Sequence, residues 1–182
     1  MNNNNGFTLV EIIVSLVIAG IMAAVAGMGI VSMVQGYDFA RENVVISQKA
    51  QLVMARLRCE LMNLSYIDST NSTGSCIIYE VETEPQPYRV IRLDSDNLKL
   101  RISQVDDCTC SSSGDTLSDK VGSFDILYQK EDGSPLTPPF DPLALRSIHV
   151  SFKLDRNDGN NANDFEITIN PRNNGNLNAP GF

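Results

Sequence analysis

Charged side chains are missing from a long stretch near the start of the chain. The 26 residues from Ile12 to Tyr37 are uncharged and mostly apolar, and Glu11 comes directly before them. As a helix, this stretch would be about 39 Å long at about 1.5 Å per residue, which exceeds the roughly 30 Å of a bilayer core. The pattern therefore predicts a membrane-spanning helix with one carboxylate near its start.

A second helical pattern follows without a break. Neither Pro nor Gly occurs from Tyr37 to Leu64. Apolar side chains recur there every three or four residues, which places them on one face of a helix. They are Ile46, Ala50, Val53, Leu57, Leu61 and Leu64. We therefore expect one helix from Phe7 to Leu64, with its first half in lipid and its second half packed on a globular domain.

The rest of the chain has the two-residue period of strands. A polar, turn-forming stretch at 68–74 ends the helical pattern, and apolar residues then alternate with polar ones in several short runs. The runs are 75–83, 88–94, 97–103, 122–130, 148–154 and 165–169. The connecting segments 106–119 and 131–142 are interpreted as loops. This order predicts an α+β fold, a long N-terminal helix laid on an antiparallel β-sheet.

Composition narrows the function of the domain that we expect at 37–182. The net charge of −8 and the lack of a basic run argue against nucleic-acid binding, which needs clustered Lys and Arg. The single histidine, His149, alternates with apolar neighbours on the polar face of a strand, where an exposed structural role is expected. No phosphate-binding loop or nucleophile motif occurs. We therefore expect no enzymatic activity and no cofactor.

Four cysteines, Cys59, Cys76, Cys108 and Cys110, are candidates for disulfides if the domain lies in an oxidising compartment. Three pairings are possible. A bridge between Cys108 and Cys110 would close a very small ring, which favours longer-range pairing, or one bridge with a partly reduced remainder. Metal binding by the Cys108–Cys110 pair is the alternative, although no neighbouring His completes a ligand set.

An oxygen-rich segment follows the 148–154 strand. It holds Asp155, Asn157, Asp158, Asn161, Asn163 and Asp164. Carboxylate and amide oxygens suit Ca²⁺, but the EF-hand spacing is missing, and Asn- and Gly-rich stretches also form ordinary hairpin loops. The segment is compatible with two interpretations, a calcium site and a solvated turn.

The N-terminal part of the chain allows three interpretations. The sequence Ala24 to Ala26 offers a signal-peptide cleavage site, and an uncut signal anchor would explain the length alone. The run from Gly6 through Phe7 to Glu11 instead resembles the prepilin peptidase site of type IV pilins and type II secretion pseudopilins. In that family a short leader ends in Gly, the mature chain starts with Phe, and Glu is its fifth residue.

The resemblance implies a leader at 1–6, a membrane and filament-core helix at 7–36, cleavage after Gly6, N-methylation of Phe7 and a role for Glu11 in assembly. It also implies an inner-membrane protein with a periplasmic domain that later enters a filament. The expected partners are membrane lipid, prepilin peptidase, an assembly platform and other pilins or pseudopilins. The C-terminal stretch 164–175 is similar to that of larger minor pseudopilins, especially the J type, and of minor pilins. The alternatives are a membrane-anchored periplasmic binding domain, calcium-dependent or not, and a β-domain secreted after a cut at Ala26.

Overall fold

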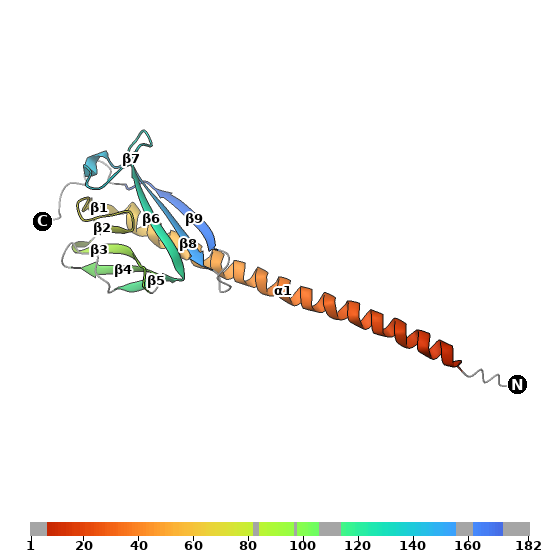
Figure 1. Ribbon diagram of the computed structural model, residues 1–182. Helices are drawn as coiled ribbons and strands as arrows, with labels where there is room; N and C mark the ends of the chain where they lie inside the picture. The colour runs from red at the N-terminus through yellow and green to blue at the C-terminus, as the bar shows by residue number, and fades with distance from the viewer. Residues whose placement is uncertain (1–6, 82–83, 97, 106–113, 156–161, 173–182) are drawn as a thin grey trace. The chain divides into compact units, whose positions relative to one another are not determined.

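The computed structural model of the protein describes residues 7–81, 84–96, 98–105, 114–155 and 162–172. The fold begins with one long helix, α1 (Leu9–Met62), and continues with strands (Figure 1). The chain divides into two compact units, residues 1–44 and residues 45–182. The first unit holds the beginning of α1, and the second holds the end of α1 and the strands that the structure describes.

Each end of α1 has a hydrogen bond, a local one at its start and a long-range one at its end. The Thr8 hydroxyl oxygen accepts a hydrogen bond from the backbone N–H of Glu11 at 3.3 Å, so Thr8 caps the helix, which begins two residues later than expected. At the other end, Met62 O accepts a bond from Arg172 N–H at 3.0 Å. The helix ends before Leu64 because that residue starts a strand and is completely buried there.

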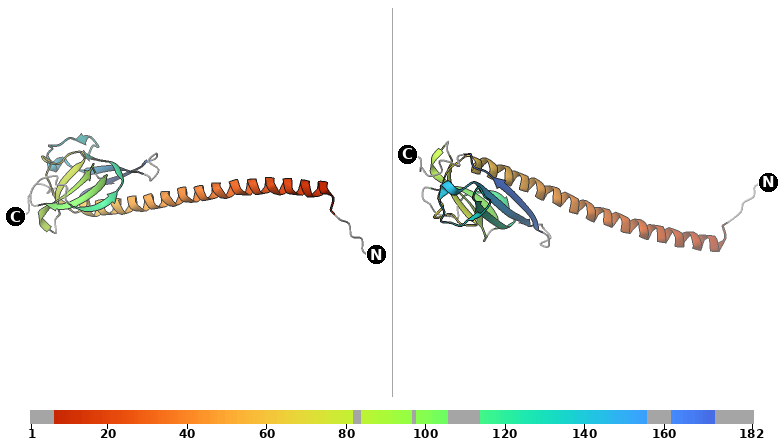
Figure 2. Two further views of the ribbon diagram at one scale, coloured as in Figure 1. Left: turned by 60° about the horizontal axis from the view of Figure 1, so that its bottom comes forward. Right: turned by 90° about the horizontal axis from the view of Figure 1, so that it is seen from above.

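In the described part of the second unit, nine strands form two antiparallel sheets (Figure 2). Sheet A has the order β1-β2-β3-β4-β5, and sheet B has the order β7-β6-β8-β9. The strands are β1 (Leu64–Ile67), β2 (Cys76–Val81), β3 (Glu84–Asp94), β4 (Lys99–Val105), β5 (Asp115–Asp119), β6 (Val121–Gln129), β7 (Pro135–Leu136), β8 (Ser147–Asp155) and β9 (Ala162–Ile169). A short 3₁₀ helix, Pro142–Ala144, lies between β7 and β8. The predicted α+β class, a long N-terminal helix with antiparallel β-structure, is confirmed.

The division into two sheets differs from the single sheet that we expected. The break lies at Lys120, which separates β5 from β6 and has a φ of 57°. A left-handed backbone conformation is uncommon for a residue with a side chain and turns the chain sharply. Hydrogen bonds hold the turn, since Lys120 O accepts from Asp155 N–H at 2.8 Å, and Val121 N–H donates to Leu98 O at 2.8 Å.

Three strands lie where the sequence predicted none. The segment 106–119 was expected to be a loop, but its last five residues form β5 and pair with β4. Gly114 permits this pairing, because it has a φ of 140° and a Cβ there would lie 2.5 Å from Ile102 O. In the sequence this glycine suggested a loop, but in the structure it lies where the backbone of residue 114 comes close to that of Ile102. Strands β1 and β7 are too short, at four and two residues, to show a sequence period.

One hydrophobic core joins α1 to both sheets. The predicted helical stripe is buried, with exposed fractions of 6% or less from Ile46 to Leu64. It packs with the inner-facing side chains of the strands, including Ile77, Tyr79, Ile91, Leu100, Phe124, Ile126, Ile148, Val150 and Phe152. Burial of this stripe positions the last turns of α1 on the β-structure, as Figure 2 shows.

Candidate processing and assembly site

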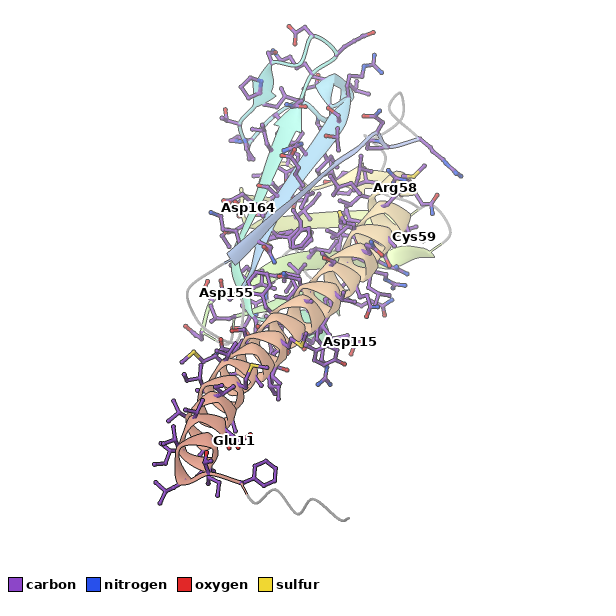
Figure 3. The ribbon with its side chains drawn as sticks, turned by 90° about the vertical axis from the view of Figure 1, so that its right-hand side faces the viewer. Glu11, Arg58, Cys59, Asp115, Asp155 and Asp164 are labelled. Carbon is purple, nitrogen blue, oxygen red and sulfur yellow. The ribbon has the colours of Figure 1, made fainter. Side chains whose placement is uncertain are left out.

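The N-terminal end of α1 presents the two described residues of the predicted processing site. Phe7 lies just before the helix with 79% of its surface exposed, and Gly6 lies outside the described residues. The side chain of Glu11 is exposed in the first turn of α1 (Figure 3). Phe7 and Glu11 are four positions apart, but the i,i+4 rule for one helical face does not apply to this pair because Phe7 precedes the helix.

Thr8 is a residue at this site that the sequence interpretation missed. The spacing of Thr8 and Glu11 is that of a capping box, in which Ser or Thr at the N-cap is followed three residues later by Glu or Gln. The structure shows the first half of the box, the bond from Glu11 N–H to Thr8 Oγ1. A carboxylate in the first turn also interacts favourably with the helix dipole. The backbone N–H of Glu11 therefore takes part in the N-cap, and its carboxylate lies where the helix dipole favours a negative charge.

The first unit carries a long apolar surface. The large hydrophobic side chains of α1 from Leu9 to Val34 are between 50% and 77% exposed. By length and composition, α1 is the one helix in the described part of the chain that can cross a membrane. The turns after Thr8 therefore present an apolar surface all the way round, which is typical of a helix that lies in lipid or in a helix bundle.

The cysteines have different states. Cys59 lies on α1 as an exposed free thiol, whereas Cys76 at the start of β2 is buried and disulfide-bonded. Cys108 and Cys110 lie outside the described residues. A free Cys59 agrees with the expectation of one bridge and a partly reduced remainder, but the complete pairing stays a prediction.

The oxygen-rich segment is described only at its two ends. Asn157 and Asp158 lie outside the described residues, while Asp155 ends β8 and Asp164 lies in β9. The Asp164 carboxylate contacts Lys153 Nζ at 3.3 Å. Within the described ranges, no group of three or more His, Cys, Asp or Glu side chains has the arrangement of a metal site. The calcium site stays a prediction.

His149 lies on the polar face of β8, as predicted, but 28% of its side chain is exposed because β9 lies beside it. Its Nδ1 is 3.0 Å from Thr168 Oγ1, and its Nε2 is 3.7 Å from Glu166. These contacts link neighbouring strands of sheet B and suit the structural role that we expected.

A buried ionic cluster was not predicted. Glu60 on α1 is 5% exposed, and its carboxylate contacts Arg56 at 2.7 Å and Arg89 at 2.6 Å. The Tyr79 hydroxyl donates to the same carboxylate at 3.2 Å. The i,i+4 spacing of Arg56 and Glu60 could have signalled one of these contacts. The cluster joins α1 to β2 and β3 and so fixes the helix on sheet A.

Two tyrosines in the core have perturbed hydroxyl groups. Burial, followed by the negative charge of Glu60, raises the pKa of Tyr79 well above its usual value. Burial also raises the pKa of Tyr128, whose hydroxyl donates to Thr73 O at 3.4 Å. Both hydroxyls therefore stay protonated in the folded unit at pH values where an exposed tyrosine ionises.

Comparison with known proteins identifies the N-terminal segment. Residues 1–27 match the family model described as the prokaryotic N-terminal methylation motif, a motif typical of type IV pilins and pseudopilins. Neither the comparison with curated proteins nor the comparison with solved structures found a match. The resemblance of this segment to the N-terminus of type IV pilins and pseudopilins is thereby confirmed, whereas cleavage between Gly6 and Phe7 and the role of Glu11 stay predictions.

Proposed function

We propose that the chain is a minor pseudopilin or minor pilin, a structural subunit that enters the tip of a type II secretion pseudopilus or a type IV pilus and primes its assembly. The observation that carries the proposal is the methylation motif at 1–27, which leads directly into the exposed apolar surface of α1. The strand-rich second unit, with its own core, supplies the globular part of such a subunit.

In this proposal, α1 has two environments in succession. The precursor is held in the inner membrane by the apolar part of α1, with the second unit on the periplasmic side. Prepilin peptidase cuts after Gly6, the new amine of Phe7 is methylated, and the same apolar surface then packs in a filament with other pilins or pseudopilins. The chain acts by assembly, with no catalytic step of its own.

Glu11 has a specific role in this sequence of events. Cleavage creates an α-amine on Phe7, which is mostly protonated at neutral pH because its reference pKa is near 8. Packed apolar helices have a low dielectric constant, so an unpaired charge there is costly and a hydrogen-bonded pair offsets much of the cost. We propose that Glu11 pairs with this amine, in its own chain or in a neighbour, and so fixes the axial position of the subunit.

Substitutions at Glu11 separate this role from helix capping. Gln retains the capping-box side chain but has no charge, whereas Ala removes both. We expect Glu11→Gln and Glu11→Ala to be processed normally and to reduce association with partner subunits by similar amounts. The measurement is co-isolation of the mature variant with other pilin-like subunits from membranes at matched levels, with Glu42→Gln as the control.

Association of Glu11→Gln at the wild-type level, together with a loss in Glu11→Ala, would assign Glu11 to capping alone. Undiminished association of both variants would show that the carboxylate has no part in assembly.

A further inference from the structure

The last turns of α1 and the strand β9 line a groove of about 710 Å³ in the second unit. Its helical side includes Met54, Ala55, Arg58 and Cys59, and its other side includes Ile167 and Arg172. Figure 3 shows Arg58 and Cys59 on the last turns of α1. A volume of this size lies within the range of protein ligand sites.

The groove has an open sheet edge along one side. β9 is the last strand of sheet B and pairs with β8, and in the described part of the chain no strand pairs with its other edge. Such an edge presents backbone N–H and C=O groups that can pair with an added strand.

The side chains around this edge leave room for another backbone. Ala55 and Cys59 are small, exposed residues on the helix side. Met54 and Ile167 are half-buried and pack against the core, so each offers part of an apolar surface to the groove. An extended chain lying here would gain backbone hydrogen bonds from β9 and apolar contacts from α1.

The groove is basic, although the whole chain has a net charge of −8. Arg58 and Arg172 both line it, and neither forms an ion pair with any residue that the structure describes. The acidic residue of the lining, Glu166, contacts His149 at 3.7 Å. Two guanidinium groups beside an apolar surface are complementary to a segment that carries both carboxylates and apolar side chains.

We propose that this groove binds an extended acidic and apolar segment of a partner protein, which adds to β9 as a further strand and places carboxylates near Arg58 and Arg172. The proposal goes beyond filament assembly and does not depend on it. The open strand edge favours a peptide over an anionic lipid, because a lipid would leave the backbone groups of β9 unpaired.

The test uses the full-length chain in phosphatidylcholine nanodiscs and a dye-labelled peptide with blocked ends, Glu-Thr-Val-Thr-Val-Thr-Glu. In a strand, both Glu and both Val residues of this peptide lie on one face. Fluorescence anisotropy should show saturable binding. Arg58→Gln and Arg172→Gln should each weaken it about tenfold, as expected for the loss of a charged hydrogen bond. The matched control Arg146→Gln, outside the groove, should bind like the wild type.

Two N-methylated versions of the peptide test the strand pairing. One carries methyl groups on the backbone amides of the Thr residues, and the other carries them on the amides of the Val residues. Alternate amides of a strand point to opposite edges, so one version should lose binding and the other should retain it. Equal behaviour of the two versions would overturn strand addition. Equal binding of a peptide with Lys in place of Glu would overturn the role of the arginines.

Alkylation of Cys59, followed by peptide mapping, locates the bound molecule. The peptide should slow alkylation of Cys59 in the phosphatidylcholine nanodiscs. Protection by phosphatidylglycerol nanodiscs, with no protection by the peptide, would assign the groove to an anionic lipid and overturn the proposal.

Discussion

Glu60 shows how a single charged residue can hold an element in place. Its carboxylate is buried, yet it has three partners, Arg56, Arg89 and the hydroxyl of Tyr79. The desolvation cost of a buried charge is offset only when such partners are present. Because Arg89 is itself only 16% exposed, loss of the carboxylate would leave a nearly buried cation without this partner.

We expect Glu60→Ala to lower the free energy of unfolding by about 3 kcal/mol, the size of effect seen when one member of a buried ion pair is removed. The measurement is reversible denaturant unfolding of the full-length chain in detergent micelles. Glu131→Ala is the matched control, since Glu131 is 85% exposed and lies 3.5 Å from Arg146. Equal stability of the two variants would show that the Glu60 cluster contributes nothing to stability.

The buried tyrosines predict how stability depends on alkaline pH. The pKa values of Tyr79 and Tyr128 are raised in the folded unit. Above about pH 10, these groups ionise in the unfolded chain but stay protonated in the folded one, so the unfolded state binds fewer protons. Their contribution is therefore present in full below about pH 10, and stability falls as the pH rises further.

We expect the free energy of unfolding to fall above pH 10 with a slope that approaches about 1.4 kcal/mol per pH unit for each of the two tyrosines. The double variant Tyr79→Phe, Tyr128→Phe should lose this part of the slope. The measurement is denaturant unfolding between pH 8 and pH 11. The same slope in the double variant as in the wild type would contradict the burial argument.

At the scale of elements, α1 carries different surfaces in its two parts. Up to Val34 its large apolar side chains are exposed, whereas from Ile46 onward an apolar stripe is buried on the sheets. Leu57 lies in the stripe and is completely buried, while Leu52 lies outside it and is 72% exposed.

Substitution of these two leucines tests which face of α1 is buried on the sheets. Leu57→Ala should lower the free energy of unfolding of the second unit by about 2–5 kcal/mol, because it removes buried methyl groups and leaves a cavity. Leu52→Ala should change it by no more than about 0.5 kcal/mol, as is usual for surface sites. Thermal or denaturant unfolding of both variants gives the comparison, and similar losses in both would show that the stripe is wrongly placed.

The helix and the longer strands were predictable because their apolar periods extend over many residues. Ile148 to Leu154 alternate cleanly, and they lie in β8 with the expected buried face. β5 was missed because all its residues but Leu117 are polar and it pairs through the close approach of Gly114. The second sheet was missed because the left-handed turn is at Lys120, a residue type that gives no turn signal.

At the scale of the whole molecule, the N-terminal residues were the most informative part of the sequence. Gly6, Phe7 and Glu11 lie within six consecutive residues, so their spacing could be recognised without any knowledge of the fold. The Glu60 cluster and the groove beside β9 bring together residues that are far apart in the chain. Sequence periods carry no information about such contacts, and the structure was needed to find them.

The proposed function makes the apolar part of α1 serve first as a membrane anchor and then as an assembly surface. The change from membrane anchor to assembly surface depends on one covalent event, removal of the segment before Phe7. An ordinary signal anchor would keep Met1, and a secreted domain cut after Ala26 would lose most of the apolar surface. The mature N-terminus therefore distinguishes the three accounts.

The most direct measurement is intact-mass and N-terminal peptide mass spectrometry of the protein from cells that make a prepilin peptidase. The account predicts a mature chain that starts at Phe7 with a methylated α-amine, and an uncut precursor for Gly6→Leu, because a large side chain before the cut would clash with the peptidase. A wild-type chain that starts at Met1 or Gly27, or normal processing of Gly6→Leu, would contradict it.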